Sequence, residues 1–269
     1  MRKLFLLAIF IFASFHFLFG QSIADYNPVW NTQSKNSSES MPCGGGDIGL
    51  NVWTEDGDIL FYMSKSGTFD ENNTLLKQGR VRLRLTPNPL ENNFSQTLNL
   101  EEGCIYIKGK DGGVASTVRI WVDVFNPMIY VDIENSKALK VEAFYENWRH
   151  EDRLLRKSES NQNSYKWAAP KELVTKKDYI AFDGDRVVFY HQNTGETVFD
   201  ATVKQQGLEH LKSQMFNPLD NLTFGGMMEG KDLFASDISK GNYASTDYQA
   251  WKLASKKPLK KTSLKIKLH

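Results

Sequence analysis

Residues 48–63, IGLNVWTEDGDILFYM, decide the fold class of this chain. Apolar side chains alternate with small or polar ones over residues 48–53, which is the period of a half-buried β-strand. Residues 59–63 form a second short apolar run. The Asp-Gly pair between the two runs is typical of the tight turn in a β-hairpin. The stretch therefore predicts two adjacent antiparallel strands.

The same period of two recurs along the chain. It appears in residues 81–85, 104–108, 117–123, 128–133, 139–144, 179–182, 186–190 and 222–228. Turn residues separate these runs about every 8–12 residues, a spacing typical of a β-sandwich or barrel. Strands and helices do not alternate, which excludes a Rossmann-like parallel sheet. We expect an all-β fold, one large, twisted, antiparallel β-sandwich.

Helical signals are few. Residues 208–215 could form two helical turns and residues 74–78 one, so we expect one or two short helices. The polar residues 149–163 read as a long loop that could divide two subdomains, although one continuous sandwich is the simpler arrangement. Residues 264–268 alternate apolar residues with lysines, which predicts a half-buried strand at the edge of a sheet.

The N-terminus has the form of a secretory signal. A basic dipeptide precedes an apolar run over residues 4–19, and small residues follow it. A bilayer-spanning helix needs roughly 20 apolar residues, so a retained membrane anchor is the weaker alternative. We expect residues 1–20 to be a cleaved signal peptide, or alternatively a cut after Ala24. A single domain over residues 21–269 would then be periplasmic or extracellular and free of the membrane.

Charge argues against nucleic acid as a partner. Lys and Arg number 33 and Asp and Glu 32, and two of the basic residues lie in the expected signal peptide. Residues 251–269 hold seven lysines and no acid, so residues 21–250 hold 24 basic and 32 acidic residues. Nucleic-acid binding favours a basic face, which this acidic body does not offer. The lysine-rich end could instead touch an anionic surface.

The two cysteines, Cys43 and Cys104, leave two interpretations open. An exported protein meets an oxidising compartment, so they could form one disulfide, and two free thiols are an equal alternative. No CxxC pair or Cys/His cluster is present, so we expect no metal site. The sequence also lacks motifs for nucleotide binding or acyl transfer, and we expect no cofactor.

The glycine-rich segment CGGGDIG, residues 43–49, is the first candidate for a binding site. It contains Asp47 and allows a close approach of the backbone. A strand follows it, whereas a phosphate-binding loop would open a helix, so nucleotide binding is a poor match. The segment is either a tight structural turn or a loop that packs beside a sugar-binding site.

Two further motifs combine aromatic and planar polar side chains. ENWRHED contains Trp148 and Arg149, and FYHQN contains His191 and Asn193. Aromatic faces can stack on sugar rings while planar polar groups pair with hydroxyls, so both motifs favour carbohydrate binding. The structural alternatives are an exposed turn with a packed tryptophan and a hydrogen-bonded structural histidine. No spacing among the 32 acids singles out a catalytic pair.

Six motifs together resemble a known domain. They are YNPVWN at 26–31, SMPCGGGDIG at 40–49, FYMSKS at 61–66, ENWR at 146–149, YHQN at 190–193 and FGGMMEG at 224–230. In this order they resemble a domain of unknown function that opens large secreted bacterial proteins related to glycoside hydrolases. More distantly, the glycine-rich opening is similar to the start of family 95 glycoside hydrolases, the α-L-fucosidase group. There Gly-Asn-Gly stands where this chain has Gly-Gly-Asp.

The resemblance implies a β-supersandwich followed by an (α/α)6 helical barrel that carries the catalytic carboxylates. This chain would end before the barrel and hold no catalytic residue. We therefore expect a non-catalytic N-terminal domain that packs on a helical catalytic domain and helps to shape a glycan pocket. The alternative is a stand-alone secreted sandwich that binds carbohydrate or has a structural role. In either case the candidate residues for binding a glycan are Asp47, Trp148, Arg149, His191 and Asn193.

Overall fold

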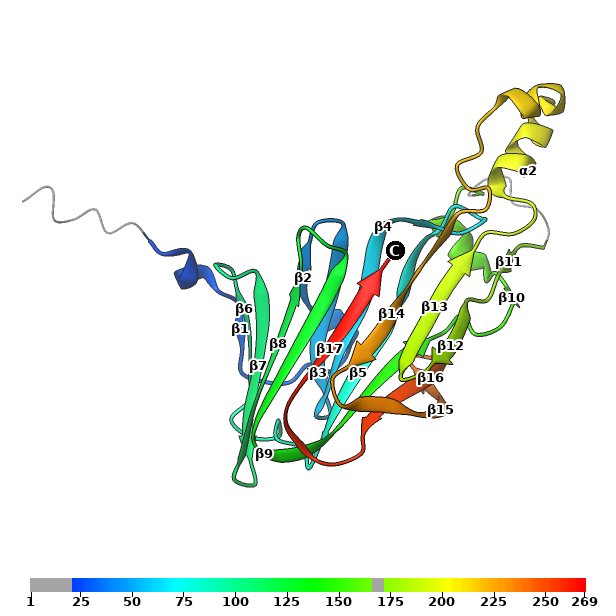
Figure 1. The fold of residues 1–269 in the computed structure, drawn as a ribbon. Helices are drawn as coiled ribbons and strands as arrows, with labels where there is room; N and C mark the ends of the chain where they lie inside the picture. Colours follow the sequence, from blue (N-terminus) through cyan, green and yellow to red (C-terminus); the bar gives the residue numbers. More distant parts are fainter. Residues whose placement is uncertain (1–20, 166–171) are drawn as a thin grey trace, which may run out of the picture.

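The computed structural model describes residues 21–165 and 172–269, so the expected signal peptide of residues 1–20 lies outside the described residues. Within them, fifteen antiparallel strands form one sheet that turns over along β9 (Met128–Asn147), and its two halves face each other as layers (Figure 1). A separate two-stranded ribbon pairs β10 (Arg153–Leu154) with β11 (Val174–Thr175). The expected all-β, twisted antiparallel sandwich is confirmed.

Both layers contain part of β9. The first layer runs in the order β1 (Val29–Trp30), β6 (Ser95–Asn99), β7 (Cys104–Asp111), β8 (Val114–Val122), β9, β17 (Leu259–Leu268), β14 (Thr223–Gly230), β13 (Arg186–Gln192) and β12 (Tyr179–Asp183). The second runs in the order β2 (Met41–Gly45), β3 (Ile48–Glu55), β4 (Asp58–Phe69), β5 (Leu75–Thr86), β9, β16 (Thr246–Ser255) and β15 (Leu233–Tyr243). The hairpin predicted over residues 48–63 is β3 and β4.

β9 is a single strand of 20 residues, where the sequence predicts two strands separated at Asn135. The first part of β9 pairs with β8 and β17, and the second part pairs with β5 and β16. Asn135 does not interrupt the strand because its polar groups have partners. Its Oδ1 accepts from Ser116 Oγ at 2.7 Å, and its Nδ2 donates to the Leu259 carbonyl at 3.2 Å.

The core lies between the two layers. The residues of β8 alternate strictly between buried and half-buried, as a strand with one face on a core requires. Tyr145 of β9 stacks on Phe189 of β13 with ring centroids 4.1 Å apart, which joins the two layers. Burying one large apolar side chain contributes about 1.5–3 kcal/mol, so this core supplies most of the stability.

The C-terminal strand β17 is central, and the prediction of an edge strand is wrong. β17 lies between β9 and β14 and pairs with both. Leu264 and Ile266 are fully buried, while Lys265 and Lys267 lie on the exposed outer face. The alternation therefore shows which face of the sheet is exposed to solvent. An inner strand of a sandwich and an edge strand have the same alternation, so it does not show where the strand lies in the sheet.

The helices are short. They are η2 (Ile23–Tyr26), η3 (Ser37–Glu39), η4 (Lys157–Gln162), α2 (Val198–Gln205) and η5 (Glu209–Gln214). η5 falls in the expected helix at 208–215, whereas residues 74–78 belong mainly to β5, so that helix prediction is wrong. The sequence analysis also missed α2, whose first turn is held by Asp200 accepting from the Thr197 backbone. No helix in the described segments is long and apolar enough to cross a membrane.

Candidate functional site

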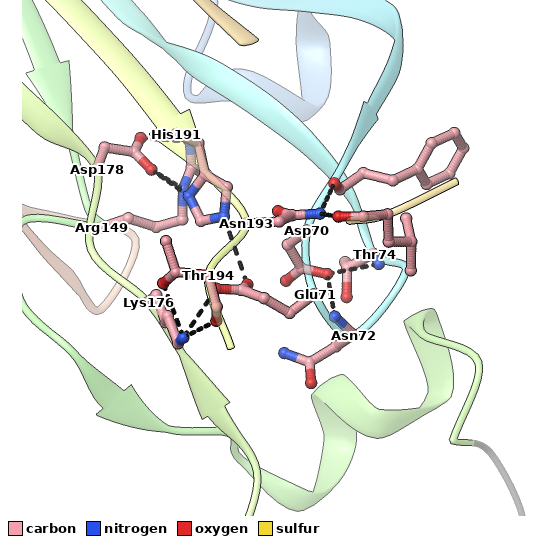
Figure 2. Close-up of polar contacts among 12 residues, drawn as sticks. Asp70, Glu71, Asn72, Thr74, Arg149, Lys176, Asp178, His191, Asn193 and Thr194 are labelled. Atoms are coloured by element: carbon pink, nitrogen blue, oxygen red, sulfur yellow. Dashed lines mark hydrogen bonds and ion pairs between the residues drawn. The ribbon is translucent and has the colours of Figure 1, made fainter. Parts of the chain in front are cut away.

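Four chain segments meet at the end of the sandwich that carries α2 (Figure 1). They are the turn between β4 and β5, the end of β9, the segment that leads into β12, and the end of β13. Figure 2 shows that these segments direct acidic, basic and amide side chains toward one another. Three of the candidate residues, Arg149, His191 and Asn193, belong to this group, and all three are buried.

Asp178 is the centre of the buried network. Its carboxylate accepts two hydrogen bonds from Arg149, Nε to Oδ1 at 3.0 Å and Nη2 to Oδ2 at 2.7 Å. His191 Nδ1 lies 2.9 Å from Oδ1, and Asn147 Nδ2 donates to Oδ2 at 2.7 Å. Burial alone would raise the pKa of Asp178, but Arg149 and His191 together lower it below its usual value. Asp178 therefore stays ionised at neutral pH.

His191 is a buried cation. Burial alone lowers the pKa of its imidazole, but the hydrogen bond with Asp178 and the negative charges of Asp178 and Glu71 outweigh burial and raise the pKa to about 9. At neutral pH both ring nitrogens then carry protons, so His191 has no lone pair with which to act as a general base. Its side chain is 1% exposed, which also keeps it from a ligand in solvent.

Glu71 completes the network from the β4–β5 turn. Its Oε2 lies 3.4 Å from His191 Nε2 and its Oε1 lies 3.6 Å from Lys176 Nζ. Within the described part of the chain neither oxygen accepts a hydrogen bond, so these contacts are ion pairs without a directed bond. Glu71 is 3% exposed, and its charge is balanced by the two cations beside it.

Asn193 and Asp70 hold the loops around this network. Asn193 Nδ2 donates to the carbonyls of Phe69 and Leu219, at 3.0 and 3.1 Å, and so ties β4 to the loop before β14. Asp70 Oδ1 accepts from the backbone N–H groups of Asn72 and Thr74 and closes the β4–β5 turn. Burial raises the pKa of Asp70. Both side chains are buried, and their hydrogen bonds to backbone groups stabilise the loops.

A pocket of about 230 Å³ lies beside the network on the outer face of the second layer. Trp148 forms part of its wall. The residues on either side of Trp148 are fixed: Asn147 Oδ1 accepts from the Arg149 backbone at 2.6 Å, and both side chains bind Asp178. The Trp148 ring meets Tyr62 of β4 edge-on, with centroids 5.8 Å apart. The buried network thus sets the position of an aromatic residue in the pocket.

The opposite wall comes from β5 and the β15–β16 hairpin. The Arg80 guanidinium stacks over the Tyr243 ring at 4.1 Å and lies 5.1 Å from Tyr248. Glu146 holds Arg80 from behind, at 2.5 Å, and also binds Arg82 at 2.6 Å. The side chains of Arg80 and Glu146 are 3% and 1% exposed, so this pair is fixed in place. The pocket wall therefore presents a rigid, layered arrangement of aromatic and guanidinium groups.

A second hollow of about 280 Å³ extends the first toward the β4–β5 turn. The two hollows share Lys77, Trp148, Arg153 and Glu159. The Glu159 carboxylate accepts two hydrogen bonds from Arg153, at 2.8 and 2.6 Å. These bonds lower the pKa of Glu159, so its carboxylate is ionised.

Comparison with known families identifies residues 29–269. They match the N-terminal domain of DUF5703, a domain of unknown function. The chain belongs to this family. A comparison with curated proteins finds no match. One similar solved structure is titled "Putative kojibiose phosphorylase from human microbiome", with 10% sequence identity and a TM-score of 0.40. The similarity covers 90% of this chain and 32% of that one, so this chain spans about a third of the length of that protein.

The DUF5703 match agrees with the resemblance to a domain of unknown function, while no finding singles out the family 95 hydrolases. The candidate residues divide into three groups in this domain. Trp148 lines the pocket, and Arg149, His191 and Asn193 form the buried framework beside it. Asp47 lies apart in the β2–β3 turn, where its carboxylate pairs with Lys65 at 3.0 Å.

Cys43 and Cys104 are free thiols in this structure. Burial raises the pKa of Cys43 to about 11, and the nearby Cys104 adds to that effect. Among the residues that the structure describes, no cluster of three or more His, Cys, Asp or Glu side chains could hold a metal ion.

Sequence reasoning missed most of the pocket wall. Tyr62, Arg80 and Tyr243 each lie on the outer face of a strand, where a polar or aromatic residue is expected in any half-buried sheet. One signal was available: arginines at positions 80, 82 and 84 alternate with apolar residues, which places three cations on one face of one strand. Asp178 and Glu71 carried no local signal, because their partners lie far away in the sequence.

Proposed function

We propose that this DUF5703 domain is the non-catalytic β-sandwich of an exported, glycoside-hydrolase-like protein, and that it supplies one wall of a glycan pocket. The proposal rests on the pocket around Trp148, where aromatic rings and guanidinium groups converge. Binding sites for small polar ligands combine aromatic surface with a few fixed polar groups. Aromatic faces suit the apolar faces of sugar rings, and guanidinium groups suit their hydroxyls.

The charges in the pocket support a non-catalytic role. Hydrolysis of glycosides ordinarily needs two carboxyl groups about 5–9.5 Å apart, one of which must hold a proton. Among the described residues that line the pocket, Glu159 is the one carboxylate, and Arg153 keeps it ionised. Asp70, which lines the adjoining hollow and has a raised pKa, is held by the backbone N–H groups of its own turn, so the proposed proton donor comes from another domain. We therefore propose that a helical catalytic domain supplies it, and we expect this chain alone to leave aryl glycosides intact.

Calorimetric titration with a panel of plant and host oligosaccharides tests the proposal. We expect at least one glycan to bind, and Trp148→Ala to weaken that binding tenfold or more, because truncating a central aromatic residue removes most of its contact energy. Trp121→Ala is the matched control, since Trp121 stacks on Tyr130 on the first layer, away from the pocket. Flat heats across the panel, or equal losses in the two variants, would contradict the proposal.

A stand-alone carbohydrate-binding module is the second candidate. It is favoured by one observation, that the described wall of the pocket needs no other chain to form. The same titration separates the two candidates. Micromolar affinity by this chain alone supports a stand-alone module, whereas measurable millimolar affinity supports a wall that another domain must complete.

A further inference from the structure

The pocket around Trp148 is much more cationic than the rest of the molecule. Lys77, Arg80, Arg153 and Arg156 line it, against the single carboxylate of Glu159. Residues 21–250 hold 24 basic and 32 acidic residues, so this concentration of cations is opposite in sign to the net charge of the segment that contains it. An excess of one charge in a hollow attracts a ligand of the opposite charge.

Lys77 is the least compensated of these cations. Its Nζ lies 4.1 Å over the Tyr62 ring, and it makes no ion pair with a carboxylate among the described residues. Other lysines on the same layer are paired, such as Lys65 with Asp47 at 3.0 Å. The Lys77 side chain is exposed at the mouth of the pocket, and the protein groups around it lower its pKa, because they remove part of its hydration without supplying a counter-charge.

The arginines are compensated only in part. Arg153 binds both oxygens of Glu159, and the charge of Arg156 acts on the same carboxylate, so two guanidinium groups share one negative charge. Arg80 Nε donates a hydrogen bond to Glu146, and the plane of the Arg80 guanidinium group lies against the Tyr243 ring. The pocket therefore keeps an excess of positive charge beside the aromatic rings that form its walls.

We infer that the pocket selects a glycan that bears an anionic group, either a carboxylate or a sulfate. We also infer that Lys77 recognises this group by forming an ion pair with it. The inference rests on the proposed glycan pocket and names its substrate class. An anionic substituent pairs with Lys77 and the nearby guanidinium groups, while the sugar ring lies against Trp148 and Tyr62. A neutral glycan leaves the ammonium group of Lys77 desolvated and unpaired, which weakens its binding.

Paired ligands test this inference. The first pair is a galacturonic acid trisaccharide and its methyl ester, and the second is a sulfated galactose disaccharide and its unsulfated form. We expect the charged member of at least one pair to bind about tenfold or more tightly than its neutral partner, because a charged hydrogen bond is lost with the neutral one. That preference should shrink as salt rises. The pair that shows the preference identifies the anion as carboxylate or sulfate.

Substitutions of Lys77 test whether this residue causes the preference for the charged ligand. Lys77→Met should remove most of the charge preference, whereas Lys77→Arg should keep it. Lys265→Met is the matched control, because Lys265 is exposed on the outer face of the other layer. Equal affinity for charged and neutral members overturns the inference but leaves the glycan pocket standing. A preference that survives Lys77→Met also overturns it, and no binding of any glycan removes both proposals.

Discussion

Substituting His191 should change how the stability of the fold depends on pH. In the unfolded chain a histidine titrates near pH 6.5, and in the folded protein the pKa of His191 is raised to about 9. Each pKa unit corresponds to about 1.4 kcal/mol, so the charged imidazole contributes about 3 kcal/mol to folding. This contribution is fully present below pH 6.5 and is lost as pH rises through 9, because the folded state then releases the proton that it held more tightly.

His191→Gln keeps a side chain of similar size that can still donate to Asp178, but it cannot titrate. Urea unfolding of both proteins between pH 6 and 9.5 gives the difference in their free energies of unfolding. We expect this difference to fall by about 3 kcal/mol over that range. His210→Gln is the control, because His210 is exposed in η5 and should follow the wild type. Parallel curves for wild type and His191→Gln would refute the assignment of a buried imidazolium.

Two further predictions concern buried charges. Glu146→Gln should lower the free energy of unfolding by about 3–5 kcal/mol, because it leaves the buried Arg80 without its carboxylate and Arg82 with Asp58 alone. Glu134→Gln, which breaks an exposed pair, should cost less than about 1 kcal/mol by the same urea titration. Arg149→Lys should cost about 1–3 kcal/mol and also weaken glycan binding measured by calorimetry, although Arg149 is buried. Arg186→Lys is the control: Arg186 belongs to an exposed ion pair, so this change should alter neither the free energy of unfolding nor the glycan affinity. Unchanged glycan binding in Arg149→Lys would show that the buried network does not position the pocket.

The fold was predictable because its signal is local, and the site was not because its contacts are distant. Alternation over residues 48–63 or 117–123 depends only on neighbouring residues, and it reports the face of a strand correctly. It cannot report a neighbour in the sheet, which is why β17 reads as an edge strand although β14 and β9 flank it. His191 shows the same limit: its motif suggested a ligand, but Glu71, 120 positions earlier, makes it part of a buried network.

The buried network and the open pocket form one mechanical unit. Replacing buried ion pairs with apolar residues often leaves a fold equally stable, so the charges around Asp178 are not needed merely to close the sandwich. These charges fix orientation, because a bidentate ion pair restricts the geometry of the groups it joins more narrowly than apolar packing does. Asn147 and Arg149 are fixed in this way on both sides of Trp148, and the ring between them then lies against Tyr62 in the pocket. Three of the polar candidate residues, Arg149, His191 and Asn193, thus lie in the framework behind the pocket, whereas Trp148 lines it.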